Sequence, residues 1–205
     1  MITAPLTVGF DLDMTLIDSR PGIHATMTEL SRVTGRYIDA DAAVTRLGPP
    51  LEEELVRWFP AEDIAAAGDR YRELYPEFAI KPTPALPGAA EAFAAIHDRG
   101  GKVMVVTAKY GPNAALHLDH LGLAPDVLVG WHWGPKKGEA LREHGASVYV
   151  GDHIGDIQGA RAAGAVAVSV ATGPISAADL AAAGTDVVLT DLRGFPAWLD
   201  GYLAA

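Results

Sequence analysis

Short apolar runs recur along the chain and indicate buried parallel strands. They lie at residues 6–10, 103–106, 127–129, 148–150, 166–170 and 187–189, and they do not alternate strictly between apolar and polar residues. Runs of this kind are typical of strands that are covered on both faces. Most are separated by alanine-rich segments that end in a glycine suited to a helix C-cap, at residues 89–100, 112–122, 138–145 and 156–164. This order predicts an α/β fold with a doubly wound parallel sheet.

One long interval breaks the alternation. Between residues 18 and 86 no run reads as a strand, and three helical patches occur at residues 22–34, 51–59 and 62–78. Proline residues separate these patches, and a proline-rich stretch follows at residues 81–88. We therefore predict an α/β core formed by residues 1–17 and 87–205, and an inserted helical unit at residues 18–86. Residues 18–21 and 81–87 are the expected hinges.

Composition narrows the class of protein. A chain of 205 residues has room for one core and a modest insertion. Its 16 basic and 26 acidic side chains give a net charge of −10, which disfavours a nucleic acid or an anionic membrane as partner. The absence of cysteine excludes disulfides, thiolate catalysis and cysteine-type zinc sites. Without a secretory signal or a membrane-spanning run, the expected location is the cytoplasm. The sequence carries no signal for an oligomeric state.

Two pairs of acidic residues follow apolar runs. Asp11 and Asp13 stand two residues apart after the first run, so they begin on the same side of the chain. Asp152 and Asp156 follow the run at residues 148–150, one helical turn apart if a helix starts there. Crowded carboxylates need a cation or a shared proton. Because all four offer oxygen ligands, the sequence predicts a site for a hard cation, most plausibly Mg2+.

These residues resemble the motifs of the haloacid dehalogenase-like superfamily, in particular its phosphatases that form an aspartyl-phosphate. The first motif, Asp-x-Asp-x-Thr, matches residues 11–15, and the fourth, Gly-Asp-x-x-x-Asp, matches residues 151–156. Thr107, which ends an apolar run, matches the second motif. The third is a lysine early in a later helix, and the family pattern favours Lys137 over Lys136 because a leucine follows Lys137 four residues on. All four motifs occur in the order of the family.

The resemblance implies a chemical role for each acid. Asp11 would be the nucleophile, and Asp13 would act as general acid and then as general base. Asp11, Asp152 and the main-chain carbonyl of Asp13 would bind Mg2+ directly. Asp156 would support the site through water or by orienting Lys137.

Other residues would bind the phosphoryl group and offset its charge. Thr107 and the backbone amide of Ala108 would bind it, and the ammonium group of Lys137 would offset its negative charge. Met14 stands where the family often has glycine, a departure that would crowd the mouth of the site without removing a catalytic group.

The predicted substrate rests on two further similarities. Thr107-Ala108-Lys109 is similar to the Thr-x-Lys of phosphoglycolate phosphatase-like members, and residues 47–55 resemble the entrance of their helical cap. The resemblance thus predicts a Mg2+-dependent phosphomonoester hydrolase for a small phosphorylated metabolite, with phosphoglycolate as the best single candidate. Lys109 and Arg46 are candidate substrate-binding residues. The alternative functions of a pyrophosphatase, a nucleotidase and a sugar-phosphate mutase are not excluded, because the cap rather than the fold selects the substrate.

Other interpretations account for fewer of the residues. A dehalogenase has no need of Asp13, and a phospho-accepting receiver domain is shorter and lacks a helical insertion. His117 and His120 are spaced for one helix face, but we expect a solvated helix rather than a zinc site. We expect Trp131-His132-Trp133 to pack in the core or on the surface rather than to line the site.

Overall fold

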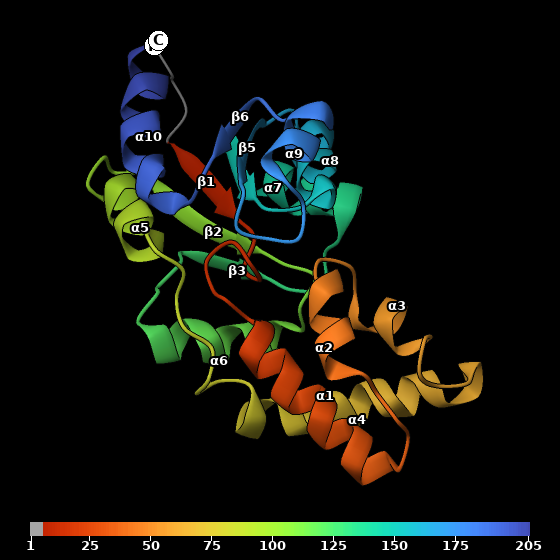
Figure 1. Ribbon diagram of the computed structural model, residues 1–205. Helices are drawn as coiled ribbons and strands as arrows, with labels where there is room; N and C mark the ends of the chain where they lie inside the picture. The colour runs from red at the N-terminus through yellow and green to blue at the C-terminus, as the bar shows by residue number, and fades with distance from the viewer. Residues whose placement is uncertain (1–5) are drawn as a thin grey trace.

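A six-stranded parallel sheet forms the centre of the protein (Figure 1). The computed structural model describes residues 6–205, so residues 1–5 of the predicted core lie outside the described residues. The strand order is β3-β2-β1-β4-β5-β6. The strands are β1 (Thr7–Phe10), β2 (Lys102–Val106), β3 (Val127–Val129), β4 (Val148–Gly151), β5 (Val166–Val170) and β6 (Val187–Leu189). Each predicted run forms a strand, and the predicted doubly wound α/β fold is confirmed.

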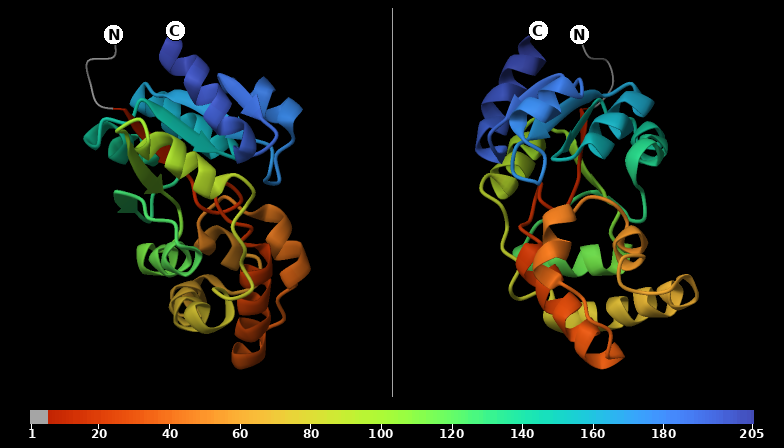
Figure 2. Two further views of the ribbon diagram at one scale, coloured as in Figure 1. Left: turned by 90° about the vertical axis from the view of Figure 1, so that its left-hand side faces the viewer. Right: turned by 45° about the vertical axis from the view of Figure 1, so that its right-hand side comes forward.

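Helices cover both faces of the sheet (Figures 1 and 2). One face packs against α5 (Ala89–His97), α6 (Gly111–Leu121) and α10 (Phe195–Ala204), and the other against α7 (Lys137–Glu143), α8 (Ile154–Ala163) and α9 (Ala177–Ala182). Short 3-10 turns at Gly134–Lys136 and Leu192–Gly194 precede α7 and α10. Because alternate strand residues point to opposite faces, Val105 joins the first apolar cluster and Met104 the second. Burial on both faces explains the continuous apolar runs.

The strand order brings three polar residues to one edge. Strand β1 lies between β2 and β4, and all three run parallel. The chain passes from β1 to β2 and β3 on one side, and then returns to β4 on the other, which makes a topological switch point. Ligands of open α/β sheets bind at such a point, beyond the carboxyl ends of the strands. Asp11, Thr107 and Asp152 directly follow β1, β2 and β4.

The segment between β1 and α5 is helical and has an apolar cluster of its own. It contains α1 (Arg20–Thr34), α2 (Ala40–Ala43), α3 (Leu51–Leu55) and α4 (Ile64–Phe78), with 3-10 turns at Val44–Arg46 and Ala61–Asp63. Met27, Leu30, Leu55, Tyr71 and Leu74 are buried among these helices. Figures 1 and 2 show them beyond the edge of the sheet at which β1 ends.

Several helices in this segment differ from the prediction. The helix expected at residues 51–59 ends at Leu55, because the amides of Arg57 and Trp58 donate to carbonyls three residues back and tighten the chain into turns. Helix α4 begins at Ile64 instead of residue 62, after a 3-10 turn. The sequence analysis missed α2, whose N-cap Asp39 accepts a hydrogen bond from the Ala42 amide at 2.9 Å.

The two connections to this segment run side by side. The Asp18 amide donates to the Pro84 carbonyl at 3.0 Å, and the Leu86 amide donates to the Leu16 carbonyl at 2.8 Å. Helix α1 already begins at Arg20, so the second half of the expected first hinge is helical. Among residues 6–205, no helix combines the length and the apolar character needed to cross a bilayer.

Gly22 is predicted to resist substitution although it lies inside α1. A Cβ atom at this position would overlap the Ala79 carbonyl and the Thr83 hydroxyl, where the two ends of the helical segment meet. Gly22→Ala should therefore lower the free energy of unfolding by about 1–3 kcal/mol, although alanine favours a helix. Gly201→Ala in α10 is the matched control, since its Cβ would meet nothing within 4 Å, and it should raise stability by up to about 1 kcal/mol. Urea unfolding measures both changes, and a stabilising Gly22→Ala would contradict the close packing.

Candidate active site

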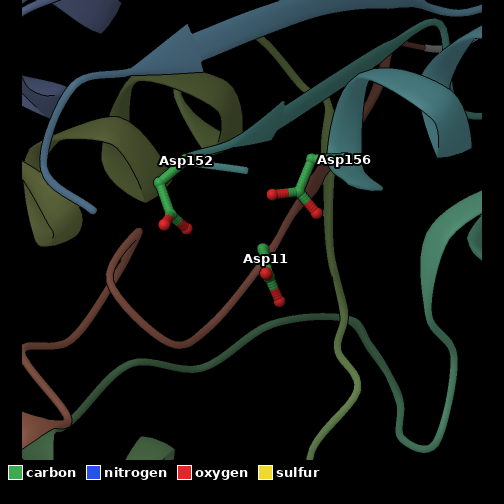
Figure 3. Close-up of side chains that lie close together, drawn as sticks. All are labelled: Asp11, Asp152 and Asp156. Atoms are coloured by element: carbon green, nitrogen blue, oxygen red, sulfur yellow. The ribbon is translucent and has the colours of Figure 1, made fainter. Parts of the chain in front are cut away.

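Three buried carboxylates meet at the switch point of the sheet. Oxygen atoms of Asp11, Asp152 and Asp156 lie within 4.8 Å of one another. Figure 3 shows the three side chains gathered around a common space. The Asp11 amide donates to the Val150 carbonyl at 2.8 Å, which extends the pairing of β1 and β4 as far as the site. The sheet itself therefore fixes the spacing of Asp11 and Asp152.

Asp156 reaches the site from the first turn of α8. Its Oδ2 accepts a hydrogen bond from the His153 amide at 2.9 Å, and His153 Nδ1 accepts one from the Gly155 amide at 3.1 Å. This reciprocal cap satisfies amides at the start of the helix and holds Asp156 in place. A Cβ atom on Gly151 would overlap the Asp156 carboxylate, so glycine at the end of β4 permits the close approach.

Lys137 is the cation of the cluster. Its Nζ donates to Asp156 Oδ1 at 2.6 Å and lies 3.1 Å from Asp11 Oδ2, and its side chain is fully buried. Lys136 is exposed. Of the two lysines that the sequence offered, the structure brings Lys137 to the carboxylates.

The charges of the cluster do not balance. With all three carboxylates ionised, the single ammonium group would leave a charge of −2 in a buried space. Burial, followed by the neighbouring carboxylates, raises the pKa of Asp11 to about 7 although Lys137 opposes the shift. The same causes raise the pKa of Asp152 well above its usual range. Burial alone would lower the pKa of Lys137, but Asp11 and Asp156 raise it. A divalent cation with a preference for oxygen ligands fits this site, because it would offset the excess charge.

The Asp13 carboxylate lies apart from this cluster. Its Oδ1 is 3.0 Å from Lys109 Nζ, and Lys109 in turn donates to the Tyr75 hydroxyl of α4 at 2.6 Å. Asp13 thus contacts the helical segment through Lys109. In the main chain, Met14 adopts the left-handed conformation, with φ at 58°. This backbone is unfavourable for a residue with a side chain, which gives a physical reason for glycine at this position in the family.

Thr107 and its neighbours form the opposite side of the site. The Thr107 side chain is buried, and its Oγ1 accepts a hydrogen bond from the Lys109 amide at 3.2 Å. The Thr107 amide donates to the Val129 carbonyl at 3.0 Å, so the residue continues the pairing of β2 and β3. Thr15 also belongs to the site, because its Oγ1 donates to Asp152 Oδ1 at 2.9 Å.

A cavity of about 420 Å3 separates the helical segment from the core. Asp13, Ala108 and Lys109 line it from the core. Arg46 lines it from the helical segment, where its guanidinium is paired with Glu54 at 2.6 Å. The structure therefore places the predicted substrate-binding residues Ala108, Lys109 and Arg46 around one space.

The sequence analysis missed several residues around this cavity. His117 was expected to be solvated, but it is fully buried, and its Nε2 lies 2.9 Å from the Tyr75 hydroxyl. That expectation is wrong because α4 packs over α6. The apolar face formed by Ala114 and Leu118 was a signal for its burial. Trp131 and Trp133 were expected to serve only in packing, but both line the cavity. No local pattern in the sequence shows this position.

The similarities to known proteins agree with this geometry. The sequence matches the family model described as haloacid dehalogenase-like hydrolase over residues 8–161, and the model described as HAD-hydrolase-like over residues 136–195. The chain belongs to the haloacid dehalogenase-like hydrolase family. The predicted family and the prediction of an enzyme are thus confirmed.

Relatives of this family cover most of the chain. A probable phosphatase IndB from Dickeya dadantii is 30% identical, over 90% of this chain and 89% of the relative. A phosphoglycolate phosphatase from Salmonella paratyphi A is 28% identical, over 81% of each chain. A haloacid dehalogenase-like hydrolase, SP0104 from Streptococcus pneumoniae, superposes with a TM-score of 0.83 at 24% identity, and covers 97% of this chain and 100% of that one.

The buried imidazole of His117 should make stability depend on pH. Burial, followed by the charge of Lys109, lowers the pKa of His117 to about 4 in the folded state. Between about pH 4 and 6.5 the unfolded chain binds the extra proton, so stability is lost as the pH falls through this window. The stability advantage of the wild type over His117→Gln should shrink by up to about 2 kcal/mol from pH 7 to pH 5. Urea unfolding at both pH values measures it, with His120→Gln on the exposed side of α6 as control. An unchanged advantage would contradict a buried neutral imidazole.

Proposed function

We propose that the protein is a Mg2+-dependent phosphomonoester hydrolase that works through an aspartyl-phosphate on Asp11. The observation that carries this proposal is the buried contact of Asp11 with Lys137, beside two further carboxylates, at the end of the central strand. A carboxylate nucleophile divides hydrolysis into two easier steps. The excess negative charge of the cluster supports a divalent cation.

In the first step, an Asp11 oxygen attacks phosphorus and the ester P–O bond breaks. Asp13, protonated at this stage, gives its proton to the leaving alkoxide. Its position supports this role, because it lines the cavity in which the leaving group would lie. Thr107 Oγ1, the Ala108 amide and Lys137 Nζ would bind the phosphoryl oxygens and offset their charge.

In the second step, a water molecule attacks the phosphorus of the aspartyl-phosphate. Asp13, now a carboxylate, takes a proton from this water, and the bond to Asp11 breaks to release phosphate. Asp11, Asp152 and the Asp13 main-chain carbonyl would hold Mg2+, with Asp156 behind them orienting Lys137. When bound, Mg2+ stabilises the charge that develops on the phosphoryl oxygens.

Residues 18–86 are proposed to form a cap over a core of residues 1–17 and 87–205. Support comes from the separate apolar cluster of the helices and from the paired connections near Asp18 and Leu86. The cavity has walls from both parts, so closure of the cap would exclude water from the reaction.

Hydrolase and mutase outcomes differ in whether water reaches the phosphorylated Asp11.

Phosphoglycolate stays the candidate substrate that the sequence resemblance predicts, and the relative named phosphoglycolate phosphatase supports it. A phosphate-release screen with Mg2+ tests it against pyrophosphate, nucleotides and sugar phosphates. Pyrophosphate release in preference to all monoesters would favour the pyrophosphatase alternative.

Asp11→Asn should reduce phosphate release by at least about 10³-fold, because an amide cannot form the acyl-phosphate. The substitution nearly preserves volume, so circular dichroism should show an intact fold. Asp119→Asn, at an exposed acid on α6, is the control and should keep wild-type rates. An Asp11→Asn protein with more than about a tenth of the wild-type rate would contradict covalent catalysis.

Chelation should abolish turnover, and Mg2+ should restore it. Ca2+ should bind without supporting turnover, because its larger and looser coordination disturbs the in-line geometry. Binding has a separate readout: Mg2+ at about 100 times its Kd should stabilise the fold by roughly 2.7 kcal/mol, seen as a rise in Tm. Asp152→Asn should lose most of this rise, while Asp119→Asn should retain it. Full activity after exhaustive chelation would contradict the metal site.

A further inference from the structure

The cavity between cap and core has more aromatic surface than a two-carbon substrate needs. Its volume of about 420 Å3 falls within the range of roughly 300–1,000 Å3 that is usual for sites of larger ligands. Tyr71, Tyr75, Tyr110, Trp131 and Trp133 all contribute to its lining. Such walls favour a planar, apolar group.

Trp131 is held in the cavity wall although it buries little of its own surface. The residue is 58% exposed, and its φ of 59° places a bulky side chain in the left-handed region. Three contacts maintain this position: the Trp131 amide donates to the Lys109 carbonyl at 3.0 Å, the ring lies 5.1 Å from that of Tyr110, and the Arg72 guanidinium lies 5.6 Å from the centre of the Trp131 ring. Unfavourable backbone of this kind persists where surrounding structure enforces it and is concentrated at ligand sites.

The charges on the cavity wall are already paired. Arg46 contacts Glu54, Arg72 contacts Glu52, and Lys109 contacts Asp13. Among the described residues that line the cavity, three cations therefore face three carboxylates. An anionic leaving group would have to displace Glu54 or Glu52 to reach Arg46 or Arg72, so the part of the wall that the helical segment forms suits an uncharged leaving group.

We infer that the substrate is a phosphomonoester whose leaving group carries an uncharged planar ring, which contacts Trp131. The inference rests on the proposed phosphatase function and names the class of its substrate. It differs from phosphoglycolate, whose leaving group is a small anion. The ring is attached either directly to the alcohol carbon or through a sugar. In both arrangements the contact with Trp131 recognises the ring.

Phosphate release by the Mg2+-loaded wild type from matched esters tests the inference. Benzyl phosphate, ethyl phosphate and 2-phosphoglycolate all release alkoxides, so differences in kcat/KM report recognition more than chemical reactivity. Adenosine 5′-monophosphate tests a ring attached through a sugar. The kcat/KM of at least one ring-bearing ester should be about tenfold or more above that of ethyl phosphate and that of 2-phosphoglycolate. A difference of this size is the effect of one aromatic stacking contact. The better of the two ring-bearing esters identifies the attachment.

Variants of Trp131 locate the recognition. Trp131→Ala should lower the ratio of kcat/KM for the preferred ring-bearing ester over ethyl phosphate by roughly tenfold, and Trp131→Phe should keep most of that ratio. Both variants retain a Cβ atom, so the unfavourable backbone is the same in each. Tyr37→Ala is the control, because Tyr37 is an exposed aromatic residue of the cap outside the cavity lining, and it should leave the ratio unchanged.

The outcomes separate this inference from the proposed function. Acetyl phosphate, a small activated acyl phosphate, reports the phosphatase function without a ring. If the protein hydrolyses acetyl phosphate but prefers 2-phosphoglycolate to the ring-bearing esters, the inference is overturned and the proposed function stands. The same holds if Trp131→Ala lowers kcat/KM equally for all esters. No phosphate release from any of these compounds would overturn both.

Discussion

The ammonium group of Lys137 contacts Asp11 and Asp156 where β1 and β4 end, and Asp152 lies beside them in the same buried space. Carboxylates that are removed from water and placed this close together repel each other, and a single lysine cannot offset all of their charge. The neighbouring structure reflects this constraint. Glycine at position 151 gives Asp156 the space to approach, and the cap at the start of α8 fixes its orientation. The site is therefore a preorganised set of charges that a divalent cation fits.

The molecule separates this charged cluster from the cavity beside the helical segment. Asp11 and Asp152 lie at the ends of paired strands, where main-chain hydrogen bonds limit their movement. Residues of α1, α3 and α4, of the loop before α3 and of loops of the core form the walls of the cavity. Lys109 connects the two regions, because it contacts Asp13 and the Tyr75 hydroxyl at once. In the proposed hydrolase, changes in the cap would thus alter selectivity while the phosphoryl site is preserved.

Much of the fold could be predicted because buried parallel strands leave a direct signal in sequence. Runs such as residues 103–106 are apolar throughout, since both of their faces are covered. The acids of the site could be placed for a related reason: each follows such a run, and parallel strands end at a common edge. The positions of His117 and Trp131 depend on which helix or loop lies opposite, which is a tertiary property. Tyr75 and α2 escaped notice because short or amphipathic helical stretches carry weaker local signals.

The hydrogen bonds around the first motif join the two ends of the chain. Thr15 Oγ1 donates to Asp152 across 137 residues of sequence, and Thr172 Oγ1 donates to the Met14 carbonyl across 158 residues. During synthesis Asp11 leaves the ribosome early, but its surroundings cannot form until the last third of the chain has followed. Contacts of such high sequence separation form late, because a long loop must close first. The acidic cluster is consequently assembled late in the synthesis of the chain, and an incomplete chain carries Asp11 without the residues that surround it in the fold.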